Sequence, residues 1–203
     1  MAKYNTIADI RKSLNGGGAR PNLFEVQFPT RGAFSIDADA QLDLKLLCKA
    51  AQLPASNVAS IDVPFRGRIM KVAGDRTFDT WTVTIINDVD FALRTAMEKW
   101  MQRIAQYSDA SGLQNPDDYK SEATVTQFKR KSSADNTGSG SGLEEAFTYD
   151  FYGIFPTNIS AIDLSYDTAD TIEEFTVEFQ VDYWLPKGVS NSADTTQQIQ
   201  GTN

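Results

Sequence analysis

Within the segment 171–184, apolar and polar side chains alternate strictly from residue 174 to residue 183. Its odd positions from 175 carry Phe, Val, Phe, Val and Tyr, and its even positions are polar: Glu174, Thr176, Glu178, Gln180 and Asp182. A period of two predicts a β-strand with one face on a core and the other in a polar environment. The fold must therefore contain a sheet with one acidic, polar face.

This strand lies in a region of unusual charge. Residues 143–186 contain ten carboxylates and neither Lys nor Arg, whereas residues 1–142 contain 16 acidic and 18 basic residues. The net charge of −8 is therefore a regional property. Acids four positions apart on one strand are about 13 Å from each other, because a strand rises about 3.3 Å per residue. That separation exceeds the ~5–9.5 Å between paired catalytic carboxylates.

A second alternating segment, 77–86, places Trp81, Val83 and Ile85 on one face and Thr80, Thr82 and Thr84 on the other. β-branched and aromatic residues suit a half-buried strand. Shorter strands are predicted at 22–28, 58–63, 68–72, 123–129, 147–155 and 160–165, and the segment 42–52 fits either a strand or a helix.

Helical spacing occurs at Leu93, Met97, Trp100, Met101 and Ile104, and it predicts one main helix at about 91–107. Asp88 or Asp90 is suited to cap its start. A short helix is predicted at 5–14 and a polar loop at 108–120. Seven or eight strands with one main helix indicate a mainly β (α+β) fold of two packed antiparallel β-sheets, or a barrel, with that helix on its flank.

The chain is predicted to be a single domain over residues 1–203. Residues 132–142 are rich in Gly and Ser, which predicts a mobile excursion, and the polar residues 188–203 predict a loose C-terminal tail. No apolar run approaches the ~20 residues that a membrane-spanning helix needs.

Several chemistries are excluded by composition. The chain has no histidine and a single cysteine, Cys48, so it cannot form a His-based catalytic triad, a thiolate zinc site or an internal disulfide. No metal or cofactor is predicted. An enzyme that uses carboxylates or lysine remains the least favoured class. The sequence pI of about 4.6 is also unlike that of a nucleic-acid-binding protein.

The sequence contains two clusters of basic residues, which we call the basic groups. One comprises Arg66, Arg68 and Lys71, and the other comprises Lys129, Arg130 and Lys131. Neither group is interleaved with aromatic residues as in single-strand nucleic-acid binders. A solvated face or a protein–protein contact is the better interpretation of both.

Three blocks of sequence resemble the tail tube proteins of contractile-tailed bacteriophages. They are GGGARPNLFEVQFP at 16–29, VPFRGRIMKVAGDRTFDTWTVTIINDVDF at 63–91 and ALRTAMEKWMQRI at 92–104. The resemblance runs loosely over about residues 16–185 and is weakest at 108–142 and in the C-terminal tail.

The resemblance implies a structural subunit of the virion without catalytic activity. Such proteins form hexameric rings that stack into a tube inside a contractile sheath, and neighbouring subunits join one sheet into a barrel around a channel. The implied partners are further copies of the chain, the sheath, the baseplate, the tail terminator, the tape-measure protein and double-stranded DNA in passage. Assembly would occur in the host cytoplasm.

The resemblance gives the polar residues an expected place. Glu174, Thr176, Glu178, Gln180 and Asp182, with Thr80, Thr82 and Thr84, are candidates to line the channel, and the two basic groups are candidates for subunit or sheath contacts. Periodicity fixes which residues share a face but not where that face points, so an exterior face or a subunit contact remains open. The alternatives are the tube of a non-viral contractile injection or secretion device and, in another class, a small-ligand β-barrel carrier.

Overall fold

The computed structural model describes residues 7–14, 18–28, 44–109, 111–130, 143–167 and 170–187. The predicted mobile excursion at 132–142 and the predicted tail at 188–203 lie outside these residues. The helices are α1 (Ile7–Ser13), α3 (Ala92–Ile104) and α4 (Pro116–Tyr119). The strands are β1 (Phe24–Gln27), β2 (Cys48–Ala51), β3 (Ser56–Phe65), β4 (Arg68–Phe78), β5 (Trp81–Ile86), β6 (Ser121–Arg130), β7 (Leu143–Ile159), β8 (Glu174–Gln180) and β9 (Tyr183–Pro186).

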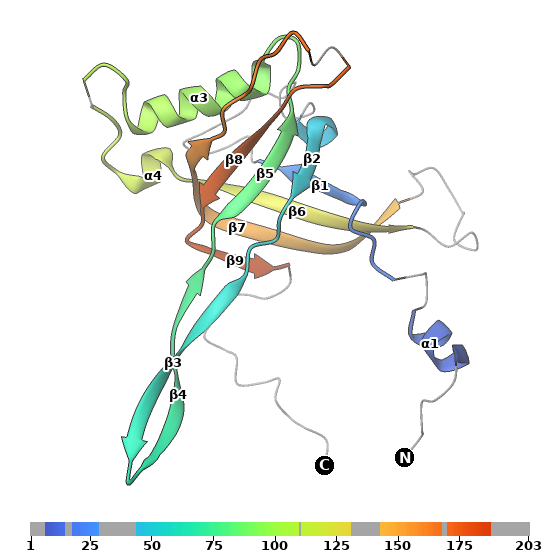
Figure 1. Cartoon of the computed structure of the whole chain (residues 1–203), viewed down its shortest axis with the longest axis vertical. Helices are drawn as coiled ribbons and strands as arrows, with labels where there is room; N and C mark the ends of the chain where they lie inside the picture. The colour runs from blue at the N-terminus through green and yellow to red at the C-terminus, as the bar shows by residue number, and fades with distance from the viewer. Residues whose placement is uncertain are drawn as a thin grey trace.

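The body of the molecule is one antiparallel sheet folded into two layers. Its strand order is β1-β6-β7-β8-β5-β2, with β9 added to β7. The 17-residue β7 belongs to both layers, because it pairs with β6 up to Ile154 and with β8 from Phe155 onward. Figure 1 shows β2, β5 and β8 running across the direction of β6 and β7. The mainly β fold with packed antiparallel sheets is therefore confirmed.

The corner between the layers is at Gly153. This residue has a φ of +65°, and a Cβ there would collide with the carboxylate of Asp182. Glycine in a strand interior commonly marks such a bend, because other residues rarely adopt a positive φ.

The core lies between the two layers and is mainly aromatic. Trp81 of β5 stacks on Phe151 of β7 with ring centroids 4.7 Å apart and an angle of 15° between the planes. Phe28 lies 5.5 Å from Phe179 and 6.3 Å from Trp100, measured between ring centroids. The odd positions of β5 and β8 are buried, as their period predicted.

Helix α3 closes one side of this core with its apolar stripe of Leu93, Met97 and Trp100. The indole Nε1 of Trp100 donates to the carbonyl oxygen of Tyr119 at 2.8 Å, which ties the short helix α4 to α3. The predicted main helix is confirmed, and the predicted loop at 108–120 contains α4 as an additional turn of helix.

The predicted cap of α3 was wrong. The N-cap is Phe91 in the left-handed conformation, with a φ of 54° and no side-chain hydrogen bond to the helix. Asp88 acts through its backbone instead, since its carbonyl accepts from the Phe91 N–H while its carboxylate accepts from the Val89 N–H.

Several strand boundaries also differ from the prediction. Segment 171–184 is two strands, because the pairing of β8 with β5 ends at Phe179, β8 itself ends at Gln180, and β9 pairs with β7. Segment 77–86 is likewise divided at residues 79–80, where a hairpin leaves the sheet. Residues 160–165 form no strand. At its start the N–H of Ser160 donates to the carbonyl oxygen of Thr176, and the hydroxyl of Ser160 accepts from the Thr176 N–H. The ambiguous segment 42–52 contains both structures, a helical turn at 44–47 followed by β2.

Strands β3 and β4 form a long two-stranded hairpin that projects from the body (Figure 1). Both strands are longer than the predicted 58–63 and 68–72, and almost every residue in them is exposed. The turn at the tip consists of Arg66 and Gly67, which have φ values of 46° and 81°. Two positive φ values are typical of the tight turn whose twist matches that of a hairpin.

Candidate functional site

The polar residues of β5 and β8 form one continuous surface. The register pairs Thr82 with Glu178, Thr84 with Thr176 and Ile86 with Glu174. Residues paired directly across two strands lie on the same face. The structure therefore brings together six of the eight predicted channel residues, which we call the β5–β8 polar face: Thr82, Thr84, Glu174, Thr176, Glu178 and Gln180.

The face lies opposite the core, and its charge is only partly neutralised. The hydroxyl oxygens of Thr84 and Thr176 lie 3.4 Å apart, within hydrogen-bond distance. At one edge Lys49 of β2 pairs with Glu174. Among the described residues, Glu178 forms no ion pair. The centre of the polar face is therefore hydroxyl-bearing with one unneutralised carboxylate.

The other two predicted residues, Asp182 and Thr80, are not on this face. Asp182 lies between β8 and β9, and Nζ of Lys120 donates to its two carboxylate oxygens at 2.6 and 2.9 Å. Thr80 is exposed between the end of β4 and the start of β5. Both residues fit the polar positions of the alternating sequence, but each lies between two strands. The chain pairs with a different strand before and after each of them.

The basic residues fall into different surroundings. Lys71 pairs with Asp62 across the hairpin at 2.8 Å, and Lys129 pairs with Glu144 across β6 and β7 at 3.1 Å. Arg66 and Arg68 lie at the hairpin tip, where the Arg66 guanidinium is 5.2 Å from the Phe65 ring centroid. Arg130 lies at the end of β6 opposite Leu143, and Lys131 is outside the described residues. Their role in subunit or sheath contacts stays a prediction.

The sequence interpretation missed an apolar surface on the hairpin. The pairs Ile61 with Val72 and Val63 with Met70 lie on one face, together with Phe65 at the tip. Phe65 is 67% exposed and Met70 is 59% exposed. A signal was present, because residues 61–65 alternate with apolar side chains at the odd positions. We call these residues the hairpin face: Ile61, Val63, Phe65, Met70 and Val72.

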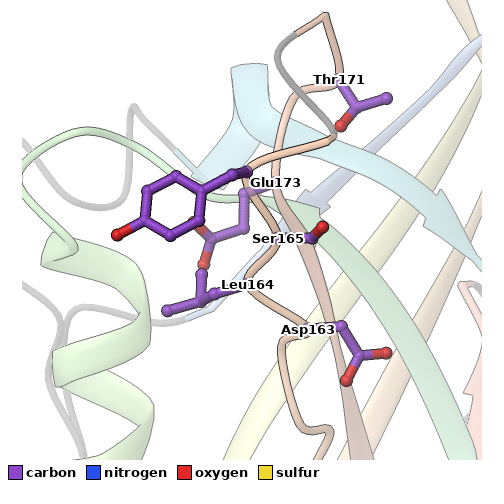
Figure 2. Close-up of a pocket in the computed structure, with 6 residues that line it drawn as sticks. Asp163, Leu164, Ser165, Thr171 and Glu173 are labelled. Carbon is purple, nitrogen blue, oxygen red and sulfur yellow. The ribbon is translucent and has the colours of Figure 1, made fainter.

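A second missed feature is an open hollow of about 480 Å³ in the connection that precedes β8. Figure 2 shows the side chains of Leu164 and Glu173 on one side of this connection and those of Asp163 and Ser165 on the other. Oε1 of Glu173 accepts a hydrogen bond from Nδ2 of Asn87 at 3.1 Å. The residues that line the hollow are Asp163, Leu164, Ser165, Tyr166, Thr171 and Glu173.

The described residues offer little for catalysis or for a metal. Burial raises the pKa of Cys48 to about 12, so this thiol is protonated at neutral pH and is a poor nucleophile. No group of three or more acidic or cysteine side chains in the described parts of the chain is arranged to hold a metal ion. Across the same residues, we find no helix with the length and apolarity required to cross a bilayer.

Known proteins similar to this chain are components of contractile tails and related devices. It is 32% identical over 179 residues to the tail tube protein gp19 of Enterobacteria phage T4, which covers 88% of this chain and 98% of that protein. The corresponding protein of Enterobacteria phage T6 is 31% identical over the same shares of the two chains.

Solved structures show the same fold at low sequence identity. A chain of the PVC sheath–tube complex, from an extracellular contractile injection system, matches with a TM-score of 0.53 at 15% identity, covering 91% of this chain and 99% of that one. The tube-terminating cap of the anti-feeding prophage matches with a TM-score of 0.56 at 15% identity, covering 84% and 91%. The family described as phage tail tube protein matches residues 19–187. The chain therefore belongs to the phage tail tube protein family.

Proposed function

We propose that this tail tube subunit forms hexameric rings which stack into a hollow tube, with the β5–β8 polar face turned to the channel. The observation that carries this proposal is the polar face itself. It is a surface on the sheet side opposite the core, and its six residues are polar, with Ile86 the apolar residue paired beside them at one end. So polar a surface is poorly suited to form the core of a subunit interface. The sheet ends at the four-residue strands β1 and β2, and joining sheets across subunits would remove such open edges.

Double-stranded DNA is the cargo that such a channel suits. A basic wall would neutralise phosphates and retain the duplex through the release of counterions. The hydroxyls of Thr82, Thr84 and Thr176 and the unneutralised Glu178 provide no such attraction. The polar face would let a polyanion pass without holding it.

The same assembly defines the other proposed partners. The tape-measure protein would occupy the channel before ejection, and the sheath, baseplate and tail terminator would contact the outside and the ends of the tube. The basic groups, which include Arg66 and Arg68 at the hairpin tip, would contribute to subunit or sheath contacts. We further propose that the subunit has no catalytic activity and assembles in the host cytoplasm.

The phage tube is favoured over its alternatives. A non-viral injection device shares the fold, but the relatives from phages T4 and T6, at 32% and 31% identity, are tail tube proteins. A small-ligand carrier would need a cavity between its layers, whereas stacked and tilted aromatic rings fill this core.

Thiol labelling of assembled tubes tests the position of the polar face. We expect Gln180→Cys in the tube to react with a small maleimide but not with a maleimide attached to a large protein, because only the small reagent enters a channel. In the free subunit the same thiol should react with both. The native Cys48 gives little background because burial raises its pKa to about 12.

If the polar face lay elsewhere in the tube, the labelling of Gln180→Cys would differ. An exterior face would react with both reagents in the tube, and a face buried in a subunit contact would react with neither. Either result would reject the channel assignment while leaving tube formation intact.

A further inference from the structure

The layer of the sheet that bears the polar face has two open edges. This layer consists of β2, β5, β8 and residues 155–159 of β7, in the spatial order β7-β8-β5-β2. Among the strands that the structure describes, β2 pairs only with β5, and residues 155–159 pair only with β8. Joining neighbouring copies into one continuous sheet would use these two edges. Their shape in the free subunit therefore decides how readily two copies join.

The edge at β2 carries a β-bulge. Two pairs of residues join β2 to neighbouring positions of β5, Cys48 with Ile85 and Ala50 with Thr84. Lys49 is therefore an extra residue that interrupts the regular pairing. Natural proteins use bulges, lysines and short strands at sheet edges to prevent uncontrolled pairing with other chains. The four-residue strand β2 combines all three of these features.

The opposite edge has a bulge of its own. Pro156 pairs with Phe179 and Asn158 pairs with Glu178, which makes Thr157 the extra residue. The proline adds a second restriction, because it has no N–H to donate to a further strand. Both edges of this layer are therefore unfavourable for pairing with a regular strand.

Each extra residue is held to β8 by its own side chain. Nζ of Lys49 reaches past β5 and donates to the carboxylate of Glu174 at the start of β8. The hydroxyl of Thr157 donates to the carbonyl oxygen of Glu178 at 3.2 Å. These bonds anchor the two bulges in the folded subunit, so the edges resist straightening when a second copy approaches.

We propose that the two anchored bulges restrain assembly, so that free copies stay monomeric and a copy joins efficiently only at the end of an existing tube. At that end the incoming copy also contacts the ring beneath it, so the weakened edge contact does not have to hold it alone. The partner at each edge is a second copy of this chain. This inference rests on the proposed tube, and it names the residues that set the barrier to starting one.

Release of either bulge tests the restraint. Thr157→Val removes one anchoring hydroxyl at nearly constant shape, and Lys49→Met removes the other anchoring group at nearly constant length. Each variant should form tubes without seeds at a protein concentration at least tenfold below that of the unmodified chain. Growth on seeds made by shearing preformed tubes should change less than twofold, because the existing ring supplies the additional contacts. Thr157→Val changes no charge, so its effect is independent of the electrostatics of the channel.

Two exposed residues of α3 provide matched controls. Thr95→Val and Lys99→Met make the same chemical changes away from both edges, and both should assemble like the unmodified chain. Urea unfolding of the free subunits should give the same midpoint for Thr157→Val and the unmodified chain. A difference in assembly between these two proteins then reflects the edge and not the folding of the subunit.

The outcomes separate this inference from the proposed function. Unseeded assembly of Thr157→Val and Lys49→Met at the original concentration would overturn the restraint. Equal acceleration of seeded and unseeded assembly would overturn it as well, since that result describes a stronger contact at every step and not a barrier to the first. Both results leave the tube intact. Failure of the unmodified chain to form tubes under any assembly condition would overturn the proposed function and this restraint with it.

Discussion

At the scale of single residues, burial separates side chains that hold the subunit together from those available for assembly. Phe179 is fully buried and its ring lies within 5.9 Å of those of Phe28, Trp81 and Trp100, measured between centroids. Phe65 has the same chemistry but lies exposed at the hairpin tip. Removing either ring deletes the same atoms from very different surroundings.

We therefore expect Phe179→Ala to lower the free energy of unfolding of the free subunit by about 3–5 kcal/mol, because it leaves a cavity in the core. Phe65→Ala should change it by less than about 0.5 kcal/mol, as is usual for surface positions. Urea unfolding of the two variants measures both values. Equal losses would contradict the assignment of the core.

The cysteine gives a pH-dependent prediction. Burial raises the pKa of Cys48 from 9.0 to about 12, so the folded chain holds the thiol proton more tightly than the unfolded chain does. Above about pH 9 the unfolded state releases this proton first, and stability should fall as the pH rises from 9 to 12.

Native subunits should accordingly react slowly with iodoacetamide at pH 8 and rapidly once unfolded in urea. A Cys48→Ala variant should lose this part of the alkaline destabilisation. Rapid alkylation of the native thiol would show that Cys48 is more accessible than its burial indicates.

At the scale of elements, the bend in β7 decides how the sheet becomes two layers. Gly153 has a positive φ, a Cβ there would collide with the carboxylate of Asp182, and Lys120 forms an ion pair with that carboxylate. Gly67 also has a positive φ, of 81°, but a Cβ there would meet no atom within 4 Å. The two glycines therefore share a positive φ but differ in the space that is available for a Cβ.

Gly67→Ala should cost about 1–2 kcal/mol, the strain of a left-handed conformation. Gly153→Ala should cost clearly more, because its methyl group also displaces Asp182 from Lys120. Equilibrium unfolding of the free subunits gives the comparison, and equal losses would mean that the Asp182 contact contributes nothing to the corner.

The sequence predicted the elements in which one face is buried, because burial of one face produces a regular spacing of apolar residues. The odd positions of β5 and β8 and the stripe of α3 were correctly assigned to the core, because a period of two or 3.6 records burial directly. Strand ends were less predictable, since alternation continues through residues 79–80 and 181–182 while the pairing partner changes.

The candidate site was predictable to the same degree. Thr82, Thr84, Thr176 and Glu178 share a face because their strands pair in register, and each strand alone indicated its half of that face. The hollow before β8 was not foreseen, because it arises from the folding of an irregular connection that has no period. The direction in which the polar face points depends on neighbouring subunits.

At the scale of the whole molecule, a single substitution on the polar face should reverse the charge of the channel wall. Glu178→Lys should turn the wall basic, so that tubes retain short duplex DNA and protect it from a nuclease too large to enter. Glu122→Lys, an exposed residue of β6, carries the same change of charge and should give no protected DNA.

Retention by the Glu178→Lys tubes should weaken as salt is raised, because counterion release drives phosphate binding. DNA that binds these tubes but remains open to the nuclease would place residue 178 outside the channel.

The most direct test is a helical reconstruction of tubes assembled from the purified chain by cryo-electron microscopy. We predict hollow, ring-stacked tubes in which Glu178, Thr84 and Thr176 line the channel. Tubes in which this face points outward or lies buried between subunits would contradict the account, as would a chain that remains a monomer under every assembly condition.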